Sequence, residues 1–90
     1  MKKHVDIIIS GKVIKVGFRF GAMEQAYKDG VTGFVKYQKS KEIYLEVEGE
    51  EENVEKFTKW CKQGCPGSQV SDIIVTASNE IKDFKSFEIL

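Results

Sequence analysis

The chain's only arginine, Arg19, ends a segment that two glycines bracket, GKVIKVGFR at residues 11–19. An arginine can hold a phosphate through two parallel hydrogen bonds, and the free N–H groups at the start of a helix also attract anions. Gly11 and Gly17 would let the connecting backbone fold its own N–H groups inward. The residue types therefore suit an anion site, although an ordinary loop followed by a solvated arginine has the same spacing.

The hydrophobic pattern predicts the elements that must position this segment. Apolar residues alternate in the expected strands and recur every three or four residues in the expected helices. In chain order we expect a strand at 3–10, a helix at 19–29, strands at 31–38 and 42–49, a helix at 51–63, and strands at 69–77 and 84–90. The segment 11–19 then joins the first strand to the start of the first helix, where the helix dipole is positive.

The order βαββαβ, with a short extra strand after it, is typical of the ferredoxin-like split βαβ arrangement. In this α+β sandwich two helices cover one face of an antiparallel sheet. The apolar residues expected to face the sheet are Phe20, Met23, Ala26 and Tyr27 in the first helix, and Val54, Phe57 and Cys61 in the second. Ninety residues are enough for one domain, which we expect to span residues 1–90.

Composition excludes several classes of protein. No apolar run approaches the roughly 20 residues of a membrane span, and the N-terminal MKKHVD lacks the apolar stretch of a signal peptide. Two cysteines, Cys61 and Cys65, are too few for a disulfide framework or a zinc cluster. We therefore expect no zinc site and no membrane as a partner, and we expect the chain to be a cytoplasmic monomer. The single histidine, His4, is expected to lie on the surface.

Charge is unevenly distributed along the chain. Residues 1–41 carry nine basic and three acidic side chains, whereas residues 42–90 carry five basic and eleven acidic ones. The first half therefore favours anionic ligands. RNA-recognition domains share the βαββαβ order, but the expected solvent face of the strand at 42–49 carries Tyr44, Glu46 and Glu48, which would repel phosphates. We expect no nucleic acid as a partner.

Two motifs resemble those of the acylphosphatase family. GKVIKVGFR resembles the signature G-x-V-Q-G-V-x-F-R, and GFVKYQKS at residues 33–40 resembles a second motif of glycine, aromatic, valine, basic residue and asparagine. The first motif matches at Gly11, Val13, Val16, Phe18 and Arg19 and departs at Ile14 and Lys15. The likeness continues to the closing SFEIL, so it covers essentially the whole chain.

The resemblance implies the ferredoxin-like fold and hydrolysis of small acyl phosphates to a carboxylate and inorganic phosphate, without metal or cofactor. It also implies that Arg19 binds the phosphate together with the loop's backbone N–H groups. The residues that contribute those groups are Ile14, Lys15, Val16, Gly17 and Phe18. Such chemistry needs positioning and electrostatics rather than a histidine, because a carboxylate is a good leaving group.

Tyr37 occupies the position of the family's asparagine, which orients the attacking water. A phenol cannot offer a water both the carbonyl acceptor and the amide donor of a carboxamide. Gln38 carries a carboxamide, but the next residue on a strand faces the other side of the sheet. We therefore expect a weak acylphosphatase, and the alternative is a catalytically silent module that binds an anion or a protein.

Lys15 stands where the family has a glycine. If that position requires a positive φ, a lysine there costs about 1–2 kcal/mol, or the loop changes shape. The lysine is either a tolerated exposed residue or an extra cation beside the site. We assign Ile14, which replaces the family's glutamine, no positive role.

Overall fold

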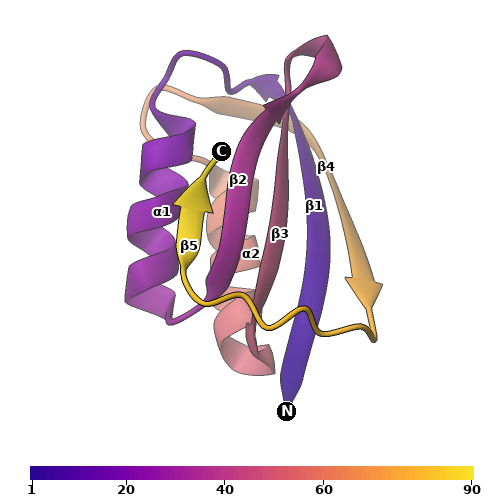
Figure 1. Cartoon of the computed structure of the whole chain (residues 1–90). Coiled ribbons are helices and arrows are strands. Elements are labelled where there is room, and N and C mark those ends of the chain that lie inside the picture. The colour runs from indigo at the N-terminus through magenta and orange to yellow at the C-terminus, as the bar shows by residue number, and fades with distance from the viewer.

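In the computed structural model, which describes all 90 residues, two helices lie against one face of a five-stranded sheet (Figure 1). The elements are β1 (Lys2–Lys12), α1 (Phe18–Asp29), β2 (Thr32–Gln38), a 3-10 turn (Lys39–Lys41), β3 (Glu42–Glu50), α2 (Glu51–Gln63), β4 (Gln69–Ser78) and β5 (Phe87–Ile89). Every predicted element is present, and the ferredoxin-like α+β fold is confirmed. Neither helix is long and apolar enough to cross a membrane.

The sheet has the strand order β4-β1-β3-β2-β5. The first four strands pair antiparallel, as predicted, whereas β5 pairs parallel with β2, so the complete sheet is mixed. The reason is the path of residues 79–86, which leave β4 at one edge and cross the face opposite the helices to reach the other edge (Figure 1). The chain therefore enters β5 in the same direction as β2.

The core lies between the sheet and the helices. From β1 it takes Val5, Ile7 and Ile9, and from α2 it takes Val54, Phe57 and Cys61, all as predicted. Burying such side chains contributes about 1.5–3 kcal/mol for each large aliphatic or aromatic residue.

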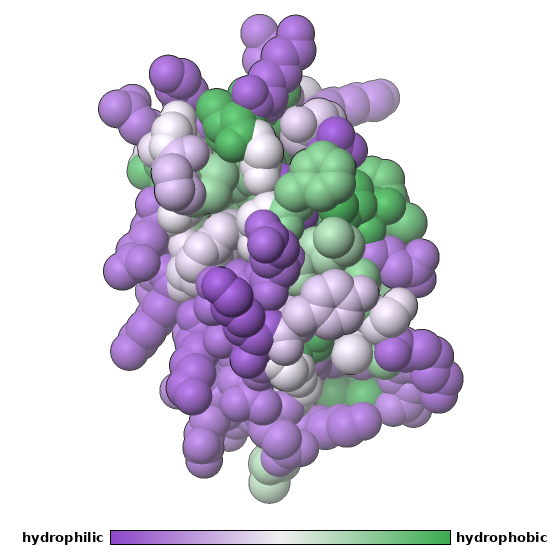
Figure 2. Space-filling view, turned by 90° about the vertical axis from the view of Figure 1, so that its left-hand side faces the viewer, coloured by the Kyte–Doolittle hydropathy of each residue, from purple (hydrophilic) through white to green (hydrophobic).

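The predicted buried face of α1 is partly wrong. Phe20 and Tyr27 are 63% and 64% exposed, whereas Ala26 is buried and Met23 partly buried, as predicted. The buried residues of the helix are Phe18, Ala22 and Ala26. These three residues are four apart, so they form one stripe, and the two alanines let the helix approach the sheet closely. Figure 2, which views the side of α1 and β5, shows hydrophobic residues (green) at the surface among hydrophilic ones (purple).

The expectation that His4 lies on the surface is also wrong. The residue is 1% exposed, and Glu46 and Glu48 on the neighbouring strand are buried as well. The crossing segment 79–86 covers them: Phe84 stacks on His4 with 6.0 Å between the ring centroids, and the N–H of Phe84 donates to Glu48. The face that the sequence pattern assigned to solvent is therefore partly covered.

Candidate functional site

The loop between β1 and α1 has two residues in the left-handed region of backbone conformation. Lys15 has φ 61° and Gly17 has φ 77°. Gly17 directly precedes α1, and added side-chain atoms there would meet nothing within 4 Å, so its glycine serves conformation rather than space. Lys15, without that freedom, holds a conformation that costs a non-glycine residue about 1–2 kcal/mol.

The start of α1 is not capped by a side chain, and no acidic residue lies in its first turn. Among the backbone N–H groups of residues 14–18, only that of Lys15 makes a hydrogen bond to another group of the chain. The remaining donors are available to an external acceptor at the positive end of the helix dipole. Residues 11–19 include no histidine, cysteine or carboxylate, so the donor set suits an anion and not a metal.

Arg19 and Tyr37 lie in direct contact across this loop. The guanidinium carbon of Arg19 is 3.8 Å from the centroid of the Tyr37 ring, and the Tyr37 hydroxyl accepts the Lys15 N–H at 3.4 Å. Tyr37 is 38% exposed, so the cluster faces solvent. The structure thus brings together Arg19 from α1, Lys15 from the loop and Tyr37 from β2.

The contact with Tyr37 leaves the N–H donors of the Arg19 guanidinium available for hydrogen bonds. A guanidinium lies flat on an aromatic ring through its π face, while its N–H donors point outward in the guanidinium plane. Tyr37 therefore restricts the orientation of Arg19 without taking its hydrogen-bond donors.

Gln38 does not lie with this group. Its amide nitrogen donates to Glu42 at 3.0 Å, and Glu42 is its partner across β2 and β3. A carboxamide held in this way is not directed at the loop, in agreement with the alternation of side chains along a strand.

The side chains of the other predicted residues hold the loop against the core. Phe18 is buried and packs on Trp60 of α2 with ring centroids 5.2 Å apart, and Ile14 and Val16 are partly buried against the core. Ile14, to which the sequence assigned no role, therefore anchors the loop.

Cys65 also braces the loop, although sequence reasoning missed it. Its thiol donates to the carbonyl of Val16 at 3.5 Å. The two residues are 49 positions apart, and neither motif contains the cysteine, so no signal in the sequence marks the contact.

The family model for acylphosphatase matches residues 5–89. The acylphosphatase of Pelotomaculum thermopropionicum is 36% identical over 88 residues, covering 98% of this chain and 96% of its own length. The acylphosphatase of Bacillus licheniformis is 35% identical over 83 residues, 92% of each chain. The crystal structure of acylphosphatase from Bacillus subtilis superposes with a TM-score of 0.94 at 33% identity, covering 100% of this chain and 99% of that one.

These similarities extend over nearly the full length of both partners, and the loop, Arg19 and the first turn of α1 lie within the matched range. The chain belongs to the acylphosphatase family.

Proposed function

We propose that this chain is a slow acylphosphatase, which hydrolyses small acyl phosphates by in-line attack of water. The observation that carries the proposal is the Arg19–Tyr37 stack beside the free N–H groups of the loop. In this proposal the stack orients the arginine for a phosphate, while a phenol stands where the family has an asparagine.

In the proposed complex the phosphoryl group lies against the start of α1. The N–H groups of Ile14, Lys15, Val16, Gly17 and Phe18 and the guanidinium edge of Arg19 bind its oxygens. To contribute, the Lys15 N–H must exchange the Tyr37 hydroxyl for a phosphate oxygen, a small change because that bond is long, at 3.4 Å. These donors stabilise the charge that spreads over the equatorial oxygens during transfer.

The attacking water is poorly positioned in this proposed site. The Tyr37 hydroxyl has a single proton to donate, so it offers a water fewer well-directed contacts than the separate carbonyl acceptor and amide donor of a carboxamide. A positioning error of about 1 Å can cost about 100-fold in rate. We therefore expect turnover well below that of a site with the asparagine.

The second candidate is a catalytically silent module that binds phosphate or a phosphorylated partner. It is favoured if the Tyr37 ring, which lies against Arg19, excludes the attacking water instead of holding it. The two candidates share the binding site and differ only in turnover.

Hydrolysis of benzoyl phosphate, followed by its loss of ultraviolet absorbance, separates them. The purified chain should exceed the spontaneous rate, inorganic phosphate should inhibit it competitively, and Arg19→Ala should return the rate to background. Phosphate binding without hydrolysis would leave the silent module. Absence of both would overturn the assignment of this loop.

A further inference from the structure

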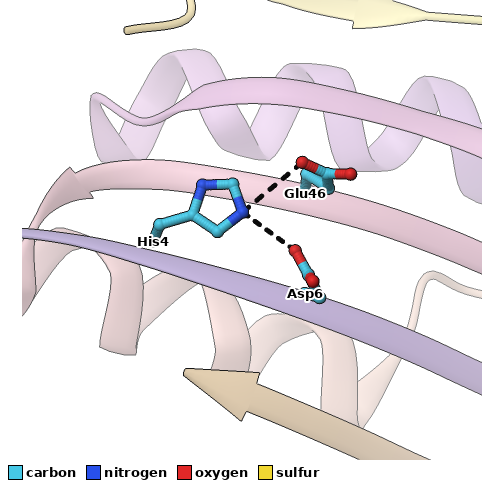
Figure 3. A group of neighbouring side chains, drawn as sticks. All are labelled: His4, Asp6 and Glu46. Atoms are coloured by element: carbon cyan, nitrogen blue, oxygen red, sulfur yellow. Dashed lines mark hydrogen bonds and ion pairs between the residues drawn. The ribbon is translucent and has the colours of Figure 1, made fainter. Parts of the chain in front are cut away.

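A second group of polar side chains lies on the face of the sheet opposite the helices. His4 and Asp6 are two residues apart on β1, and Glu46 on β3 pairs across from Asp6, so the antiparallel register directs all three to one spot (Figure 3). The Nε2 atom of His4 is 2.9 Å from an Asp6 carboxylate oxygen and 3.4 Å from one of Glu46. We call these three residues the His4 cluster.

Both nitrogens of the His4 ring face carboxylates. The Nδ1 atom is 2.7 Å from a Glu48 oxygen, while Nε2 faces Asp6 and Glu46. A neutral imidazole has one N–H donor and one acceptor nitrogen, and an acceptor nitrogen directed at a carboxylate is repelled by it. A positive species between Nε2 and the two carboxylates, either a proton or a metal ion, would remove that repulsion.

We propose that the His4 cluster binds a divalent transition-metal ion such as Zn²⁺, with Nε2 of His4 and the carboxylates of Asp6 and Glu46 as ligands. A tetrahedral zinc site with bonds of about 2.1 Å sets its ligand atoms about 3.4 Å apart. The candidate atoms all lie within 4.8 Å of one another, so small side-chain rotations complete the geometry. The Asp6 side chain is 38% exposed, which gives the ion a route in and a water as fourth ligand.

The surroundings support this choice. The Nδ1–H of His4 donates to Glu48, an outer carboxylate of the kind that fixes the tautomer and orientation of metal-bound histidines. Glu46 accepts hydrogen bonds from the Tyr44 hydroxyl and from the Lys82 ammonium, both at 2.8 Å, which hold its carboxylate in place beside His4. One nitrogen and two carboxylate ligands suit zinc and its neighbours better than calcium.

Lys82 competes for the same position. Its ammonium lies 2.8 Å from the Glu46 oxygen that would bind the metal, and the side chain is 49% exposed, so it can swing into solvent. Three carboxylates, those of Asp6, Glu46 and Glu48, face one lysine here, and the excess negative charge attracts a dication. A bound ion would join β1 and β3 beneath the crossing segment 79–86.

This site is independent of the proposed phosphate site. His4 and the loop after β1 are nine residues apart on one strand, a separation of about 30 Å. Metal binding is therefore expected to leave phosphate binding unchanged.

Calorimetric titration of the full chain with Zn²⁺, and with Co²⁺ followed by its visible absorption, tests the proposal. We expect one ion per chain, affinity at least about 10-fold weaker in Asp6→Asn, and affinity about 3- to 10-fold tighter in Lys82→Met, which removes the competing ammonium. Asp72→Asn, an exposed carboxylate change on β4, is the matched control and should bind like the parent chain.

Three results would overturn the metal site. One is no binding at millimolar metal, which would leave a proton as the partner of Nε2. Another is a sulfur-to-cobalt charge-transfer band, which would place the ion on Cys61 or Cys65. The third is weaker binding in Lys82→Met. Because Asp6 is partly exposed, Asp6→Asn should fold, and far-ultraviolet circular dichroism confirms it before titration.

Discussion

Replacing Tyr37 with asparagine should raise kcat and weaken substrate binding at the same time. The carboxamide restores an acceptor and a donor for the attacking water, contacts that act mainly in the transition state and therefore appear in kcat. One such preorganised contact is worth about 100- to 1,000-fold in related chemistry, and imperfect placement reduces this to about 10-fold. We expect a gain of about 10- to 1,000-fold.

Substrate binding weakens because the contact between Arg19 and the Tyr37 ring is lost. Asparagine removes the ring that lies 3.8 Å from the Arg19 guanidinium, so the arginine must be ordered by the substrate. An exposed cation–π contact is worth about 0.5–1 kcal/mol, which corresponds to a KM increase of about two- to fivefold.

Tyr37→Phe is the matched control, because it keeps the ring and removes only the hydroxyl. It should leave KM near the parent value and lower kcat if the hydroxyl holds the water. Initial rates of benzoyl phosphate hydrolysis over a range of concentrations give both constants. A folded, phosphate-binding Tyr37→Asn variant with no gain in kcat would refute the reasoning, since the loop itself would then misplace the phosphorus.

Three further predictions concern Arg19, Lys15 and Cys61. Arg19→Ala should abolish hydrolysis and inhibition by phosphate, since two charge-assisted hydrogen bonds worth about 1.5–3 kcal/mol each are lost; phosphate titration by amide NMR shifts checks this. Lys15→Gly should stabilise the fold by about 1 kcal/mol in urea unfolding, because φ 61° suits glycine, and should tighten phosphate binding about two- to fivefold. Burial raises the pKa of the Cys61 thiol above its ordinary 9.0, so the folded state keeps a proton that the unfolded state loses. Because of this group, the free energy of unfolding should fall by about 1.4 kcal/mol per pH unit above pH 9. Cys61→Ala should lose this part of the pH dependence, which thermal melts at several pH values above 9 check.

The strands and the second helix could be predicted because their periodicity is unambiguous. Val54, Phe57 and Cys61 form one apolar stripe on a helix that is mostly polar elsewhere, and all three are buried. The first helix carries apolar residues on several sides, so its pattern did not decide which side faces the sheet. Its main anchor, Phe18, also lies one residue before the predicted helix start.

The burial of His4 could not be predicted from local pattern. It depends on residues 79–86, a mostly polar segment that crosses the sheet. The path of this segment follows from the pairing of β5 with the outer edge of β2. The alternation of Glu46 and Glu48 is typical of a solvent face. Only the pairing of β1 with β3 reveals that a histidine and three carboxylates share one spot.

Motif matching located the loop and Arg19, but it treated Lys15 and Tyr37 as separate departures. In the structure they meet, because the N–H of Lys15 donates to the hydroxyl of Tyr37. The left-handed conformation of Lys15 orients that N–H, so the two substitutions depend on each other. Residues in direct contact commonly couple by about 0.5–3 kcal/mol. The effects of Lys15→Gly and Tyr37→Asn on phosphate affinity should therefore not add, and strict additivity in the double variant would show that the contact carries no energy.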